Sequence, residues 1–144
     1  MTIALGHRDA TTADVPVLSR MNQQLIEDEG HRNPMNLVEL ETRMRSMLDA
    51  DHMATLFESR GRVIAYALWR EEPEWVYLRQ FFVARDRRRR GVGRQAIRVL
   101  AGQVWPANTG VRVNVLIGNL PALEFWRAVG FTDYLITLEM ERTH

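Results

Sequence analysis

The sequence contains neither cysteine nor lysine, which excludes several kinds of chemistry. Without cysteine there can be no disulfide, no thiolate nucleophile and no cysteine-ligated metal. Without lysine there can be no lysine Schiff base, and all 19 basic residues are arginine. No set of His, Asp and Glu has metal-ligand spacing, so we expect no metal. A membrane-spanning apolar run of roughly 20 residues and a signal-peptide pattern are also missing, so we expect a cytoplasmic protein without a membrane partner.

The length and composition are those of one globular domain. The chain has 144 residues, of which 46% are hydrophobic and 26% are charged. This length supports a hydrophobic core of ordinary size. We therefore expect a single domain over residues 1–144.

Charge is distributed unevenly along the chain. The stretch from Arg85 to Arg98 holds seven arginines and one aspartate, a local charge of +6. The remainder holds 12 basic and 17 acidic residues, a charge of −5. One basic spot on an acidic protein favours a focused anion site over a broad nucleic-acid surface, which needs many separate phosphate contacts. The acidic remainder favours a cationic acceptor, such as an amine.

Apolar periodicity, helix caps and turn residues predict ten elements. Strands are expected at 3–8, 53–58, 63–69, 75–83, 111–116 and 134–140, and helices at about 12–29, 36–49, 91–104 and 120–129. Hairpin-linked strands in the middle are followed by strand–helix–strand units. This order indicates an α/β fold with a mixed, mostly antiparallel central sheet and helices on both faces.

The loop between the strand ending at Val83 and the next helix has the features of an anion site. The first N–H groups of a helix have no intrahelical partner, and the helix dipole places positive charge there. Gly91 and Gly93 allow an anion close to the backbone. The loop lacks the lysine of a P-loop and the third glycine of a dinucleotide fingerprint. A solvated charge run and a nucleic-acid patch over Arg85–Arg90 remain alternatives.

Two motifs together resemble the GNAT acyltransferase superfamily. The spacing Arg88-x-x-Gly91-x-Gly93 resembles the family signature [Gln/Arg]-x-x-Gly-x-[Gly/Ala]. The second block, "NLPALEFWRAVGF", resembles the family's asparagine, aromatic pair and Gly-Phe ending. The order of elements agrees as well, so the resemblance covers almost the whole chain and implies the GNAT fold.

The resemblance implies a site for acetyl-coenzyme A as co-substrate. The loop would hold the pyrophosphate through backbone N–H groups of about Arg89, Arg90, Gly91, Val92, Gly93 and Arg94, with Arg88 at the signature position. The arginine side chains could reach the outer phosphates. The preceding strand would splay at a bulge, and Phe82 and Val83 would pair with the pantetheine arm. Asn119 would lie beside the pantetheine, and Phe125 and Trp126 match the family's aromatic pair.

The catalytic groups depart from the family pattern. Trp126 stands where many members have an acidic tyrosine, and Tyr77 stands near the position where some have a strand glutamate. Tyr77, Tyr134 or water could therefore protonate the leaving thiolate. Glu29, with His31, could orient or deprotonate the amine; alternatively, residues 27–29 are an ordinary solvated helix end.

The expected function is N-acetyl transfer from acetyl-coenzyme A to a primary amine of a small molecule or peptide, by direct attack on the thioester. Many relatives form dimers, so a homodimer is an alternative to a monomer. Two other functions remain open: a catalytically silent acyl-CoA-binding domain, and nucleic-acid binding through the arginine patch.

Overall fold

The computed structural model describes residues 4–30 and 32–143, so His31 lies outside the described residues. The chain divides into two compact units, Met1–Asn114 and Val115–His144. Along the chain, no described helix is long and apolar enough to cross a membrane.

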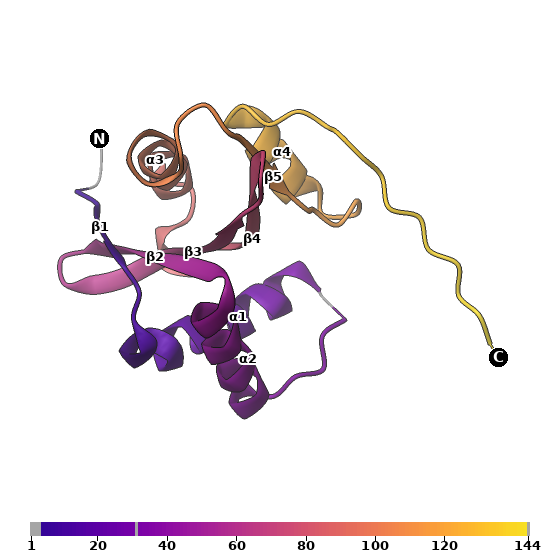
Figure 1. Cartoon of the computed structure of the whole chain (residues 1–144), viewed down its shortest axis with the longest axis horizontal. Coiled ribbons are helices and arrows are strands. Elements are labelled where there is room, and N and C mark those ends of the chain that lie inside the picture. Colours follow the sequence, from indigo (N-terminus) through magenta and orange to yellow (C-terminus); the bar gives the residue numbers. More distant parts are fainter. Residues whose placement is uncertain (1–3, 31, 144) are drawn as a thin grey trace. The chain divides into compact units, whose positions relative to one another are not determined.

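The first unit is built on a five-stranded sheet in the order β1-β2-β3-β4-β5 (Figure 1). The strands are β1 (Gly6–Asp9), β2 (His52–Ser59), β3 (Arg62–Glu71), β4 (Trp75–Val83) and β5 (Gly110–Val113). The pairs from β1 to β4 are antiparallel, while β4 and β5 are parallel. The predicted mixed, mostly antiparallel sheet is thus confirmed.

Helices cover both faces of this sheet (Figure 1). A short turn, η1 (Thr12–Asp14), leads into α1 (Val15–Glu29), and α2 (Leu37–Ala50) follows on the same face. On the other face, α3 (Val92–Val99) follows the turn η2 (Arg85–Arg87) and continues into η3 (Leu100–Val104), which is wound as a π-helix.

The helix ends form where the sequence predicts them. Gly30 ends α1 with a left-handed φ of 62°, as expected for a residue without Cβ. Asn36 caps α2 by accepting a hydrogen bond from the Glu39 N–H at 2.9 Å, and Glu39 accepts one in return from the Asn36 N–H. This reciprocal pair is a capping box. The core then forms between the sheet and the inner faces of α1 and α2, where Val15, Leu18, Met44, Leu56, Tyr66 and Leu68 are fully buried.

The second unit contains α4 (Leu120–Ala128), which begins after Asn119 and is followed by Gly130 at a φ of 111°. The predicted strand at 134–140 is wrong, because no strand is assigned within residues 131–143. Its apolar members are largely exposed, with 69% of Ile136 and 88% of Leu138 accessible. Alternating apolar residues favour a strand, but a strand exists only where its backbone pairs with another.

Candidate functional site

The outer edge of β4 opens halfway along the strand. β3 pairs with β4 from Val76 to Val83, whereas β5 pairs only with Trp75–Leu78. At the point where β5 stops, Leu68 lies opposite Gln80 and Trp69 opposite Leu78. Arg79 is therefore an extra residue, and the strand is bulged there. Beyond the bulge, residues 80–83 form an edge that β5 does not cover.

The backbone directions along this edge follow from one hydrogen bond. The Ala84 N–H donates to the Ile64 carbonyl at 2.8 Å. Because hydrogen-bonded pairs alternate in an antiparallel ladder, Phe82 also faces β3, while Phe81 and Val83 direct their backbone groups outward. Of the two predicted pantetheine contacts, Val83 thus presents its backbone to the open edge. Phe82 instead contributes a buried ring, centred 6.1 Å from the ring of Tyr66.

The predicted anion loop leads from this edge to the start of α3. Two residues adopt left-handed backbone conformations, Arg89 at a φ of 62° and Gly91 at 78°. Such a conformation is costly for arginine, at about 1–3 kcal/mol. No side chain caps the helix, and its first bond after Gly91 runs from the Gln95 N–H to the Gly91 carbonyl at 3.0 Å. The N–H groups of residues 92–94 consequently have no partner within the helix and suit an anion.

Arg88 turns away from the helix start. Its Nε donates to the Val83 carbonyl at 2.9 Å, and its Nη2 donates to Asp28 Oδ2 at 2.5 Å. Its guanidinium carbon also lies 5.4 Å from the centre of the Phe82 ring. The signature arginine therefore joins the end of β4 to the last turn of α1.

Asp28 holds the loop from α1 by binding two arginines at once. Arg85 donates from Nε at 2.9 Å and from Nη2 at 2.6 Å to Asp28 Oδ1, while Arg88 donates to Oδ2. Glu27 adds a longer contact to Arg85, at 3.4 Å. Burial would raise the pKa of Asp28, but the bonds from Arg85 and Arg88 outweigh it and lower the pKa. Residues 27–28 thus neutralise two loop arginines, which the sequence did not reveal.

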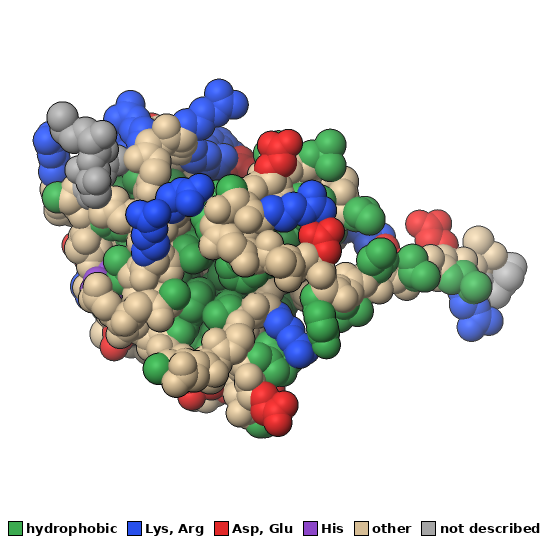
Figure 2. Space-filling model, turned by 90° about the horizontal axis from the view of Figure 1, so that it is seen from above, with side chains coloured by type: hydrophobic (Ala, Val, Ile, Leu, Met, Phe, Trp, Pro, Cys, Tyr) green, Lys and Arg blue, Asp and Glu red, His purple; other side chains and the backbone are tan. Residues whose placement is uncertain are grey.

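Other arginines of the loop keep their charge available. Arg89, Arg90 and Arg94 are exposed and form no ion pair with any residue that the structure describes. Figure 2 shows arginine side chains gathered on one part of the surface, over the region of α3. The arginines without an ion pair therefore lie at or next to the uncapped start of α3, and this arrangement can bind a phosphate group.

The predicted catalytic residues lie on separate elements. Tyr77 is on β4 before the bulge, and its hydroxyl accepts a bond from Asn114 Nδ2 at 3.4 Å. Glu29 is the last residue of α1 and is half-buried. Tyr134 belongs to the second unit, where 73% of it is exposed. The structure does not place Tyr134 relative to the other two.

The motif residues of the second unit organise α4. The Asn119 side chain accepts a bond from the Ala122 N–H at 3.3 Å, which caps the helix. The Trp126 ring is buried and lies 5.0 Å from the rings of both Phe125 and Phe131. The aromatic pair of the motif therefore forms the packing centre of this unit.

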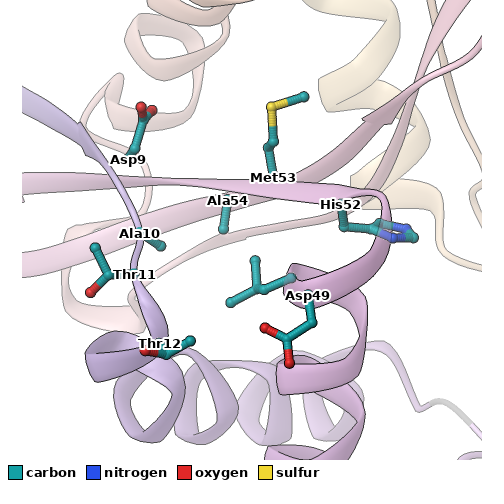
Figure 3. A pocket seen from close by; sticks show the side chains of 9 residues that line it. Asp9, Ala10, Thr11, Thr12, Asp49, His52, Met53 and Ala54 are labelled. Atoms are coloured by element: carbon teal, nitrogen blue, oxygen red, sulfur yellow. The ribbon is translucent and has the colours of Figure 1, made fainter.

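A pocket of about 320 Å³ lies elsewhere, where the end of β1 and η1 meet the junction of α2 and β2 (Figure 3). Ala10 and Ala54 line it together with Asp9, Asp49 and His52. In Figure 3 the His52 ring points away from Asp49. None of the predicted site residues lines this pocket.

A family model described as acetyltransferase (GNAT) matches residues 19–131. No curated protein matches the chain.

Solved structures share the fold at low sequence identity. An aminoglycoside N-acetyltransferase in complex with CoA has a TM-score of 0.77 and 15% identity, over 100% of this chain and 98% of that one. The aminoglycoside 6'-N-acetyltransferase from Acinetobacter haemolyticus has a TM-score of 0.73 and 16% identity, over 96% and 99%. An acetyltransferase from Thermus thermophilus has a TM-score of 0.74 and 22% identity, over 90% and 88%.

Proposed function

The chain belongs to the GNAT family of acetyltransferases, and we propose that it moves an acetyl group from acetyl-coenzyme A to a primary amine by direct attack. The observation that carries this proposal is the continuity of two features. The uncovered edge of β4 leads through residues 84–91 to the uncapped start of α3. Coenzyme A has an extended pantetheine arm with a pyrophosphate at one end. The open strand edge suits the arm, and the helix start that follows it suits the pyrophosphate.

The pyrophosphate would bind at the start of α3. The N–H groups of Val92, Gly93 and Arg94 would donate to its oxygens, and the helix dipole would add to the attraction. Arg89 and Arg90 would supply further charge-assisted bonds, each contributing about 1.5–3 kcal/mol. Arg88 would act indirectly, because its guanidinium already holds Val83 and Asp28.

The pantetheine arm would lie along β4 as an additional strand. The outward backbone groups of Phe81 and the N–H of Val83, whose carbonyl already accepts a bond from Arg88, would pair with its amides, as in other cases of strand addition. This pairing would direct the thioester toward the bulge at Arg79, where the ladder is interrupted. A backbone N–H there can donate a hydrogen bond to the thioester carbonyl oxygen.

In the reaction, the amine nitrogen would bond to the acetyl carbon as the carbon–sulfur bond breaks. One proton would leave the nitrogen, and one would go to the departing thiolate. We assign the first transfer to Glu29, directly or through water, and the second to Tyr77 or Tyr134. The Trp126 indole N–H is not an acid near neutral pH. The family match spans both compact units, which supports a single catalytic domain over residues 1–144.

The binding step can be tested with a matched pair of glycine substitutions. Gly61 and Gly91 both have a φ of 78°, and a Cβ at either position meets nothing within 4 Å. Gly91→Glu and Gly61→Glu should therefore cost similar stability, but only Gly91→Glu places a carboxylate at the proposed anion site. We expect acetyl-CoA to raise the Tm of the wild type and of Gly61→Glu, and to leave that of Gly91→Glu unchanged.

Catalysis is then tested by thiol release from acetyl-CoA over a broad panel of amines. Release with at least one amine, and an acetylated product of the right mass, would support the proposal. A coenzyme-induced rise in Tm without release from any amine would favour the catalytically silent alternative. No rise in Tm at millimolar acetyl-CoA would refute the proposal.

A further inference from the structure

The end of α1 is tied to the arginine loop by a single carboxylate. Asp28 is the second-last residue of α1, and its side chain is only 19% exposed. Its Oδ1 accepts bonds from Arg85 Nε and Nη2 at 2.9 and 2.6 Å, and its Oδ2 accepts one from Arg88 Nη2 at 2.5 Å. Isolated ion pairs on a surface hold little, but a carboxylate that is bonded through both oxygens to two residues of one loop has a defined geometry.

The first part of α1 is held differently, by the core. The buried residues of the helix all lie in its first eight positions, at Val15, Leu18, Ser19, Met21 and Asn22. None of residues 23–29 is buried, although Leu25 packs partly against the core. The position of the last turn therefore depends strongly on the bonds of Asp28.

Arg88 joins the same carboxylate to the open edge of β4. While its Nη2 binds Asp28, its Nε donates to the Val83 carbonyl at 2.9 Å. In the proposed complex, acetyl-CoA would bond to the Val83 N–H before the loop and to the N–H groups of residues 92–94 after it. Both ends of the loop would then be fixed, and Arg85 and Arg88 would be fixed with them.

The residue that follows Asp28 is the proposed base. Glu29 is half-buried and ends α1, and the left-handed φ of Gly30, 62°, stops the helix directly after it. Asp28 and Glu29 are consecutive in one helical turn, so a loop that fixes Asp28 also limits the positions open to the Glu29 carboxylate.

We propose that Asp28 is a positioning residue that couples acetyl-CoA binding to the last turn of α1, so that the bound coenzyme holds Glu29 in place for the incoming amine. This inference rests on the proposed function, which supplies both the coenzyme site and the role of Glu29. Asp28 itself touches neither substrate. It acts because a coenzyme that orders the loop leaves the end of α1 fewer conformations.

Hydrogen exchange of the backbone amides tests this coupling with acetyl-CoA as the probe. In the wild type, saturating acetyl-CoA should slow exchange at residues 92–94 and also at residues 26–30, the latter by about fivefold or more. In Asp28→Asn, the slowing at residues 26–30 should disappear, while that at residues 92–94 should remain. Asp28→Glu should recover part of it, because it keeps the charge.

Asp14→Asn is the matched control at the other end of the same helix. Asp14 also holds an arginine through both oxygens, since Arg8 Nη1 and Nη2 donate to it at 2.9 Å each. It precedes Val15, far along the helix from the arginine loop. Asp14→Asn removes a comparable ion pair, yet it should leave the effect of acetyl-CoA at residues 26–30 intact.

Kinetics give a second readout, which a merely structural role would not produce. With the amine that releases thiol fastest in the panel, Asp28→Asn should lower kcat/KM for that amine about tenfold, because Glu29 is misplaced. The Kd of acetyl-CoA should change by less than about threefold. A general loss of structure would instead weaken coenzyme binding to the same extent.

The outcomes separate this inference from the function beneath it. Slower exchange at residues 92–94 without slower exchange at residues 26–30 would overturn the coupling and leave the coenzyme site intact. Slowing at residues 26–30 that persists in Asp28→Asn, or an unchanged kcat/KM in that variant, would also overturn it. No effect of acetyl-CoA on any amide of the wild type would instead overturn the proposed function.

Discussion

Replacing Asp28 with asparagine tests whether the end of α1 holds the arginine loop. The carboxylate makes pairs with Arg85 and Arg88 at 2.6 and 2.5 Å. Its own side chain is 19% exposed, but the two arginine side chains are 54% and 39% exposed. Solvent screening therefore limits each pair to about 1 kcal/mol. Removing a negative charge from a helix C-terminus returns about 0.5 kcal/mol, so we expect a net loss of about 1–1.5 kcal/mol.

Urea denaturation measures this loss, with Glu27→Gln as the control. Glu27 is adjacent and carries the same charge, but its contact with Arg85 is 3.4 Å long and its side chain is 61% exposed. We expect Glu27→Gln to change the free energy of unfolding by less than about 0.5 kcal/mol. Equal effects of the two substitutions would refute the bridging role of Asp28.

The stability that Asp28 contributes should also depend on pH in a defined direction. The pKa of Asp28 is lower in the folded protein than its ordinary value of 3.8. Its contribution to stability is therefore complete above about pH 5 and is lost as pH falls below 3.8 through the folded pKa. The difference between wild type and Asp28→Asn should shrink at acidic pH. A difference that is constant down to about pH 2 would contradict the ion-pair explanation.

Further predictions concern the buried tyrosine and the candidate catalytic groups. Tyr66→Phe removes the hydroxyl that donates to Gln80 Oε1 at 2.9 Å and should lower the free energy of unfolding by about 1 kcal/mol, measured by urea denaturation; no loss would show that this bond is dispensable. Tyr77→Phe should lower kcat about tenfold or more without changing acetyl-CoA affinity, if its hydroxyl protonates the thiolate. Glu29→Gln should lower kcat/KM for the amine and shift its pH profile; full activity of Tyr77→Phe, Tyr134→Phe and Glu29→Gln together would exclude all three assignments.

Local features of the fold could be predicted from the sequence because neighbouring residues determine them. The strand predicted at 75–83 is β4 as observed, and the helices predicted to end at about 29 and to begin at about 36 are bounded by Gly30 and Asn36. The strand predicted at 134–140 was wrong because its alternating pattern reports only which side chains could share a face. Pairing, which makes a strand, depends on other parts of the chain.

The features that the sequence did not reveal join residues far apart. The bonds from Arg85 and Arg88 to Asp28 span 57 and 60 positions, so no local pattern indicates them. The bonds from the Arg88 side chain to the Val83 carbonyl and to Asp28 were likewise not predicted. The bulge at Arg79 arises from a mismatch in register between β3 and β4, which becomes visible only when the two strands are aligned.

The central claim is that acetyl-CoA lies on the open edge of β4 and at the start of α3. Hydrogen exchange of the backbone amides, with and without acetyl-CoA, tests it most directly. We predict slower exchange at Phe81 and Val83 and at residues 92–94, and no change in Gly91→Glu. Protection confined to other regions, such as the pocket beside His52, would contradict the account, as would no protection at saturating acetyl-CoA.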